Sequence, residues 1–107
     1  MGERANIYRH VVLFKFKDSA SAETVAAIED AFRALCTTLP FVTDFEWGLN
    51  SSREGLDQGF THCFIVTFAG PGGRDAYLPR PAHKAFVSRW LDPHLDKVCV
   101  VDFAARD

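Results

Sequence analysis

The segment Gly59-Phe-Thr-His-Cys-Phe-Ile-Val-Thr-Phe68 is the densest run of β-branched and aromatic residues in the chain. Turn-forming residues bound it on both sides, Asp57-Gln-Gly59 before it and Ala69-Gly-Pro-Gly-Gly73 after it. This pattern is typical of a central β-strand. Alternate side chains then point to opposite faces, with His62 on the more aromatic face and Cys63 on the other. Both faces are largely apolar, so each needs a covering layer.

Three other segments alternate between two faces in the manner of strands. They cover residues 8–16, 41–48 and 97–103. The first of them repeats the pattern of the opening segment, because a histidine begins its aromatic face, which carries His10, Val12, Phe14 and Phe16. Residues 1–6 are polar, and we expect them to be frayed.

Segments that are expected to be helical lie between these strands. Apolar residues spaced by three and four predict a helix over 22–38, which begins after Ser21 and ends before Pro40. A short helix is expected over 74–78. A longer one is expected over 81–91, because proline is well tolerated in the first turn of a helix.

The resulting order β-α-β-β-α-β is the signature of a ferredoxin-like α+β fold, a four-stranded sheet with helices on one face. We expect the two central strands to be parallel neighbours, which would place His10 and His62 side by side, on the order of 5 Å apart. The other face would remain uncovered. An apolar patch of this kind marks an interface, so we predict a homodimer that closes sheet against sheet into an α+β barrel, through Val11, Leu13, Cys63 and Ile65.

The composition narrows the class of protein. A chain of 107 residues is expected to form one domain, residues 1–107 with a core over about 8–103. The formal net charge of −2 and the absence of a long basic cluster argue against nucleic acid or an anionic membrane as the main partner. Three widely spaced cysteines and the lack of a signal-peptide pattern predict reduced thiols and a cytoplasmic location.

The chain resembles the stress-responsive A/B barrel domain family of the dimeric α+β barrel superfamily. The resemblance covers nearly the whole chain. It rests on His10-Val-Val-Leu-Phe-Lys-Phe-Lys17, on Trp47-Gly48, on the opening segment, and on Tyr77 followed by Arg80-Pro-Ala-His-Lys-Ala-Phe86. These motifs are specific for the family in this order, but they do not specify one activity. One plant member is a cofactor-independent polyketide cyclase that performs an intramolecular aldol condensation.

By resemblance to that cyclase, His83 corresponds to the general base and Tyr77 to a catalytic tyrosine. His10 corresponds to the histidine that orients the base, and His62 to a histidine that lines the pocket. Phe32 is a departure, because the cyclase has a pocket tyrosine there. Imidazole titrates near neutral pH and a tyrosine hydroxyl can stabilise an oxyanion, so both types suit proton transfer at a carbonyl. The alternative for each residue is structural: a helix-turn tie, a strand-edge histidine or a packing tyrosine.

Several aromatic residues are expected to belong to the core and to form the apolar wall of a ligand pocket, namely Phe14, Phe32, Phe64 and Trp90. Three functions are compatible with such a pocket. The first is a polyketide-cyclase-like or lyase/isomerase-type enzyme acting on a small apolar carbonyl compound without a cofactor. The second is a non-catalytic small-molecule-binding dimer, and the third, by superfamily analogy, is a haem-dependent or oxygenase activity. Three converging histidines could bind zinc, but no carboxylate or cysteine stands at ligand spacing, so no metal is expected.

Overall fold

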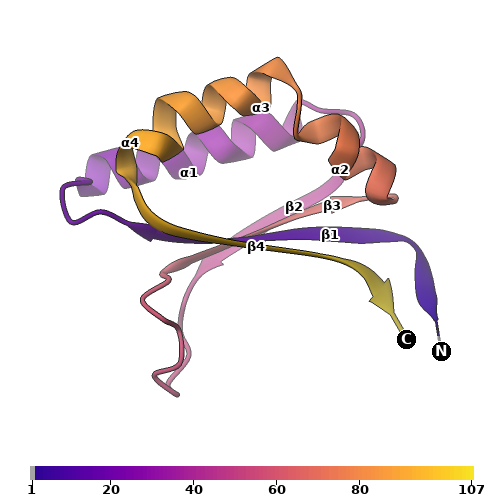
Figure 1. Ribbon diagram of the computed structural model, residues 1–107, viewed down its shortest axis with the longest axis horizontal. Coiled ribbons are helices and arrows are strands. Elements are labelled where there is room, and N and C mark those ends of the chain that lie inside the picture. Colours follow the sequence, from indigo (N-terminus) through magenta and orange to yellow (C-terminus); the bar gives the residue numbers. More distant parts are fainter. Residues whose placement is uncertain (1) are drawn as a thin grey trace.

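The computed structural model describes residues 2–107, which form one four-stranded sheet with a layer of helices. Figure 1 shows the helices on one face of the sheet, which is the predicted ferredoxin-like α+β arrangement. The strand order is β2-β3-β1-β4, and every neighbouring pair is antiparallel. The elements follow in the order β1 (Glu3–Phe16), α1 (Ala22–Thr37), β2 (Val42–Leu49), β3 (His62–Phe68), α2 (Pro71–Tyr77), α3 (Pro81–Phe86), the π-helical segment η1 (Val87–Leu91), α4 (Asp92–His94) and β4 (Leu95–Arg106).

Helix α1 lies within one residue of its predicted bounds, because the capping signals at both ends act as expected. The hydroxyl of Ser21 accepts a hydrogen bond from the backbone N–H of Thr24 at 3.1 Å, which satisfies a donor of the first turn. At the other end, Thr38 caps the helix ahead of Pro40. The buried face of α1 packs on the sheet through Ile28, Phe32, Leu35 and Cys36.

The N-terminal segment is part of the sheet, so the expectation of a frayed segment was wrong for residues 3–6. Glu3 pairs with Arg106, because β4 continues beyond the predicted end of the last strand. Asn6 has a positive φ of 62°, and the register of β1 against β4 shifts between Glu3 and Tyr8. This irregularity breaks the alternation that sequence patterns detect. Met1 lies outside the described residues.

The central strands run antiparallel, which corrects the prediction of parallel neighbours. Helix α1 returns the chain so that β2 follows the direction of β1, and the loop over 50–61 then reverses it, so β3 opposes both. In this register His10 stands opposite Val66, and His62 stands opposite Phe14. The two histidines are therefore separated by four residue positions along the strands, roughly 13 Å. They lie toward opposite ends of the sheet and not side by side.

The predicted helix over 81–91 is divided. After α3, the backbone widens into the π-helical segment η1, where the N–H of Asp92 bonds to the carbonyl of Val87. Pro93 enters immediately afterwards, and its missing N–H leaves the carbonyl of Arg89 without the usual helical partner. Such π-helical turns are rare and recur at functional sites. Helix α2 begins three residues before its predicted start, with Pro71 at its N-terminus.

An aromatic cluster fills the space between the sheet and the helices. The rings of Phe32 and Phe64 stack at 4.6 Å, and those of Phe14 and Phe64 lie 5.0 Å apart. Phe14 and Phe64 are both fully buried. Because Phe32 comes from α1 and its partners come from β1 and β3, this cluster fixes the helix on the sheet.

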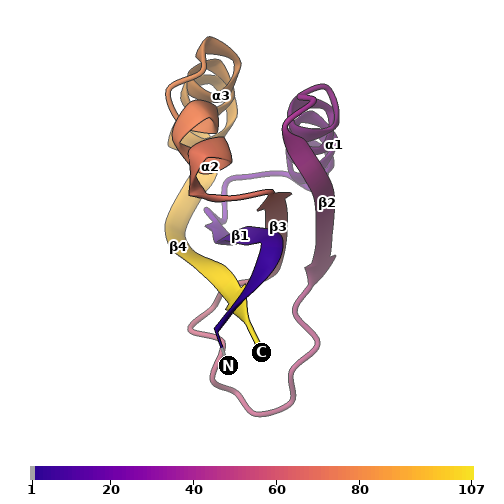
Figure 2. The same ribbon diagram turned by 90° about the vertical axis from the view of Figure 1, so that its right-hand side faces the viewer.

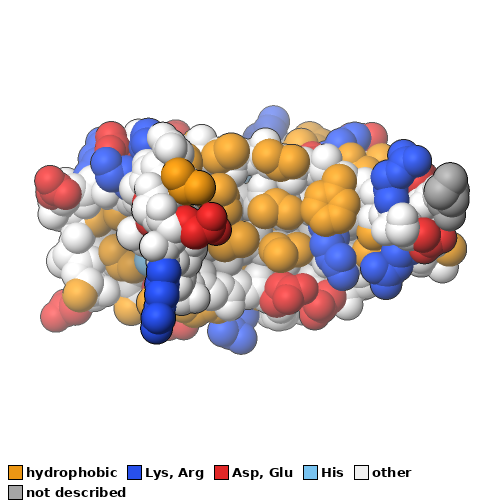
Figure 3. Space-filling view, turned by 90° about the horizontal axis from the view of Figure 1, so that it is seen from below, with side chains coloured by type: hydrophobic (Ala, Val, Ile, Leu, Met, Phe, Trp, Pro, Cys, Tyr) orange, Lys and Arg blue, Asp and Glu red, His pale blue; other side chains and the backbone are white. Residues whose placement is uncertain are grey.

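The opposite face of the sheet has no helix over it in the described residues. Figure 3 shows a band of hydrophobic side chains along this open face of the sheet. On strand β4 of this sheet, the side chains of Val101 and Phe103 are 58% and 42% exposed. The β2–β3 loop projects from the sheet on this side, as Figures 1 and 2 show. Within residues 2–107, no helix combines the length and the hydrophobicity needed to span a membrane.

Candidate functional site

A cavity of about 520 Å³ opens between strands β1 and β4 and the helical layer. This volume is in the range of small-molecule sites. Its walls are mostly apolar, formed by side chains of the sheet, of α1 and of α3 with η1, such as Val12, Phe14, Phe32, Phe86, Leu91 and Val100. Its polar groups include His10, Tyr77, His83 and Asp102.

His10 is buried, with 4% of its surface exposed, and it is paired with an aspartate on the neighbouring strand. Asp102 stands directly opposite it in the β1–β4 register, and the Nδ1 and Oδ1 atoms are 2.6 Å apart. Because an ionised carboxylate only accepts hydrogen bonds, Nδ1 carries the proton. The other carboxylate oxygen of Asp102 lies 3.4 Å from the guanidinium of Arg74. The Nε2 atom of His10 has no hydrogen-bond partner within residues 2–107, and the side chain lines the cavity.

His83 lies in the first turn of α3 and is half-buried. Its Nδ1–H donates a hydrogen bond to the carbonyl oxygen of Leu78 at 3.0 Å, so the neutral ring has its lone pair on Nε2. Burial lowers the pKa of His83, the Leu78 hydrogen bond opposes this shift, and the nearby His10 adds to it. The tautomer of His83 is thus fixed by a backbone carbonyl, whereas the sequence analysis assigned that task to His10.

Tyr77 ends α2 and lies between the two imidazoles. Its ring centroid is 5.8 Å from that of His10 and 4.6 Å from that of His83. Its hydroxyl lies 3.8 Å from the Sγ atom of Cys36, on helix α1. Burial raises the pKa of Tyr77, and it raises the pKa of the Cys36 thiol to about 12. The ring of Tyr77 therefore lines the cavity, while its hydroxyl is engaged with a buried thiol that does not line it.

His62 belongs to a separate cluster near the other end of the sheet. Its Nε2 lies 2.7 Å from a carboxylate oxygen of Glu29, and its Nδ1 lies 2.9 Å from the hydroxyl of Thr61. Trp47 stacks on the ring at 5.9 Å. Both ring nitrogens of His62 have partners, and His62 does not line the cavity that contains His10, Tyr77 and His83.

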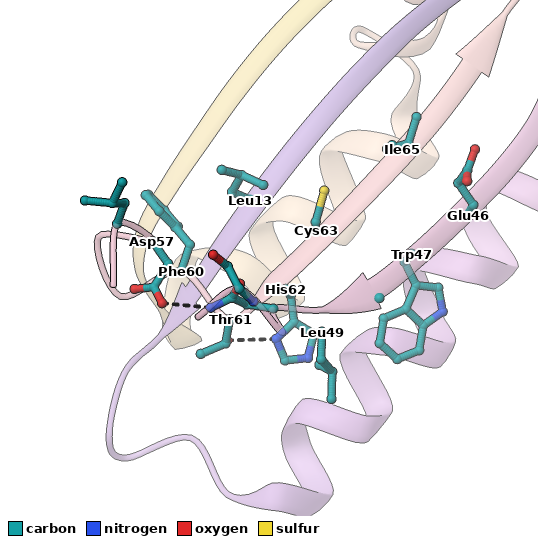
Figure 4. Close-up of a pocket in the computed structure, with 14 residues that line it drawn as sticks. Leu13, Glu46, Trp47, Leu49, Asp57, Phe60, Thr61, His62, Cys63 and Ile65 are labelled. Carbon is teal, nitrogen blue, oxygen red and sulfur yellow. Dashed lines mark hydrogen bonds between the residues drawn. The ribbon is translucent and has the colours of Figure 1, made fainter. Parts of the chain in front are cut away.

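His62 instead borders a second hollow, of about 470 Å³, between the open sheet face and the β2–β3 loop. Figure 4 shows this hollow, with Leu13, Cys63 and Ile65 on the sheet side. Its polar side chains bond to one another, since Asn50 donates to Asp57 at 2.7 Å. The first cavity, whose two imidazoles each present an unpaired Nε2, is the better candidate for chemistry.

Only part of the predicted aromatic wall lines the His10 cavity. Phe14 and Phe32 line the His10 cavity. Phe64 is buried behind Phe32, and Trp90 lines a small groove between α1 and α3. Asp102 was not predicted as a site residue, although it is a single acidic residue within the apolar run 98–103. Among the described residues, no group of three or more His, Cys, Asp or Glu side chains is arranged to hold a metal ion.

Comparison with known proteins agrees with this architecture. The model of the Stress responsive A/B Barrel Domain family matches residues 8–105. The stress-response A/B barrel domain-containing protein HS1 of Arabidopsis thaliana is 35% identical over 103 residues, which cover 96% of this chain and 94% of the relative. Olivetolic acid cyclase of Cannabis sativa is 28% identical over 101 residues, which cover 92% of this chain and 96% of the cyclase.

Solved structures show the same fold. Hydroxynitrile lyase from Passiflora edulis superposes with a TM-score of 0.88 at 22% identity, covering 97% of each chain. A protein from Thermobifida fusca, described as a dimeric ferredoxin-like protein, superposes with a TM-score of 0.76 at 24% identity. The alignment covers 97% of this chain and 95% of that protein.

Proposed function

The chain belongs to the stress-responsive A/B barrel domain family, and from this premise we propose that its cavity catalyses cofactor-independent proton transfer on a small apolar carbonyl compound. One observation carries the proposal. His83 presents an unpaired Nε2 to a mostly apolar cavity, with its tautomer fixed by Leu78. An imidazole in this state is a general base.

The physical state of His83 suits removal of a proton next to a carbonyl group. Its lowered pKa keeps the ring unprotonated at neutral pH, where it can accept a proton. A carbon acid of this kind leads to aldol-type cyclisation, to lyase chemistry or to isomerisation. The relatives named as a cyclase and as a hydroxynitrile lyase support an enzymatic function of this general type.

The test measures exchange of the α-protons of phenylacetone in D₂O by NMR. His83→Gln should slow the catalysed exchange by about 100-fold or more, since general acid–base groups contribute roughly 10²–10⁴-fold. His94→Gln is the matched control, because it removes an imidazole that does not line the cavity. Undiminished exchange in His83→Gln would show that the base is elsewhere. Binding of phenylacetone without any exchange by the wild-type protein would favour the non-catalytic binding protein.

Tyr77 remains a predicted catalytic residue, with its hydroxyl as the group in question. Tyr77→Phe removes the hydroxyl and keeps the ring between the imidazoles. A large loss of exchange in this variant would mean that the hydroxyl leaves Cys36 and reaches the substrate in the bound state.

We also propose a homodimer that covers the open face of the sheet. Exposed Val101 and Phe103 on β4 and the 70% exposed Leu56 of the β2–β3 loop supply apolar surface for it. The dimeric description of structural neighbours supports this assembly. Phe103→Glu should yield monomers in sedimentation velocity at micromolar concentration. Ser88→Glu, which adds the same charge on the exposed helical layer, should leave the dimer intact, and a wild-type monomer would refute the proposal.

A further inference from the structure

The cavity needs a group that stabilises negative charge on the carbonyl oxygen when the α-proton leaves. Tyr77 was the predicted donor, but its hydroxyl is engaged with the Sγ atom of Cys36 at 3.8 Å. His83 cannot donate there in its neutral form, because its only N–H is bonded to Leu78. The Nε2 atom of His10 is the remaining imidazole atom at the cavity without a partner in the described part of the chain.

We infer that His10 and His83 form an acid–base pair, in which His10 donates a proton from Nε2 to the carbonyl oxygen while His83 takes the α-proton. Asp102 is the positioning residue that allows His10 to do so. This inference rests on the proposed function and assigns the substrate class as neutral ketones or aldehydes that carry an α C–H bond.

The surroundings of the two imidazoles give them different tasks. The carboxylate of Asp102, 2.6 Å from Nδ1, orients His10 so that its Nε2 side faces the cavity. Arg74, which is always charged, lies 3.4 Å from the other oxygen of that carboxylate and helps to hold it in place. His83 faces no carboxylate at hydrogen-bond distance in the described residues, and its burial disfavours the charged ring. This arrangement suits His10 to donate a proton and His83 to accept one.

The step balances without any cofactor. The Nε2 lone pair of His83 takes the α-proton, the C–H electron pair becomes the C=C bond, and the C=O π pair accepts the proton from Nε2 of His10. The products are an enol, protonated His83 and neutral His10. Reversal of the step with a deuteron on His83 gives α-exchange, and attack of the enol on a second carbonyl would give an aldol product.

The positions of the imidazole protons test the inference without reference to turnover. Histidine ¹⁵N chemical shifts of the wild-type protein under the conditions of the exchange assay should show a proton on Nε2 of His10 and none on Nε2 of His83. Asp102→Asn should abolish this difference and slow phenylacetone exchange by about 10–100-fold, the range typical of a partner that orients a histidine in a functional site. Asp75→Asn is the control, since Asp75 also pairs with Arg74 but is exposed and does not line the cavity.

The outcomes separate this inference from the proposed function. If Nε2 of His83 carries the proton and Nε2 of His10 does not, or if Asp102→Asn exchanges as fast as Asp75→Asn, the assignment of His10 as the acid is wrong. If His83→Gln exchanges at the wild-type rate, the proposed function itself fails. The ¹⁵N measurement on the wild-type protein needs no variant. The inference therefore remains testable even if Asp102→Asn misfolds.

Discussion

Two adjacent glycines in helix α2 provide a sharp test of how this helix is seated on the sheet. A Cβ atom at Gly73 would lie 2.8 Å from Cβ and Cδ1 and 2.9 Å from Cγ of Phe68, which is fully buried. A Cβ atom at Gly72 would meet nothing within 4 Å. Both residues belong to the first turn of α2, so Ala at either position has a similar effect on the helical backbone.

The magnitudes predict opposite signs for the two variants. Replacing a helical Gly by Ala stabilises by at most about 1 kcal/mol through the entropy of the unfolded chain. Overpacking a buried site costs about 1–3 kcal/mol, and Phe68 has no free space into which to move. Gly73→Ala should therefore lower the free energy of unfolding by about 1–2 kcal/mol, whereas Gly72→Ala should raise it slightly.

Urea unfolding followed by tryptophan fluorescence measures both changes, at one fixed protein concentration because a dimer's stability depends on it. With an m-value of about 1–3 kcal/mol/M, Gly73→Ala should shift the midpoint down by about 1 M. The variant should also slow phenylacetone exchange, since Arg74 and Tyr77 follow Gly73 on the same helix. Equal midpoints for the two alanine variants would refute the close seating of α2 on β3.

Three further predictions concern ionisable groups. Because burial lowers the pKa of His83 from 6.5, the catalytic base stays unprotonated as the pH falls through 6.5, so the acid-side decline of kcat/KM for exchange should lie below pH 6.5; an acid-side decline that begins above pH 7 would contradict this. Glu29→Gln should reduce the free energy of unfolding at pH 7 by about 1–2 kcal/mol, because a charge-assisted bond to His62 becomes a neutral one, and chemical denaturation measures it. Cys36 is fully buried within the chain and its pKa is raised to about 12, so in the monomeric Phe103→Glu variant a thiol reagent at pH 8 should label the two half-buried cysteines of the open sheet face first, as mass mapping would show; early labelling at Cys36 would contradict its burial.

Much of the fold followed from periodicity. The aromatic run ending at Phe68, the Ser21 cap and the break at Pro40 place their elements to within a few residues, because each signal is local. Family resemblance, and not periodicity, assigned Tyr77, His83 and His10 to one pocket, and all three line the same cavity in the structure.

The errors arose where non-local pairing decides the outcome. Strand direction depends on how the connection through α1 and the loop over 50–61 turn the chain. The alternation of side chains within a strand carries no information about this direction. Because the central strands were predicted to be parallel, His62 was expected beside His10. In the structure, His62 bonds to Glu29 instead. Asp102 escaped notice for the same reason, since only the β1–β4 register puts it opposite His10.

The antiparallel register leaves the sheet with two histidine–carboxylate pairs that share no residue. His10 and Asp102 join β1 to β4 at a cavity, while His62 and Glu29 join β3 to α1 four residue positions further along the strands. Because sites this far apart, with no common partner, contribute additively, Glu29→Gln and Asp102→Asn together should destabilise by the sum of their separate effects to within about 0.5 kcal/mol. Substitutions at the cavity can thus change its chemistry without weakening the His62–Glu29 contact that joins β3 to α1. This separation favours evolutionary diversification of the cavity.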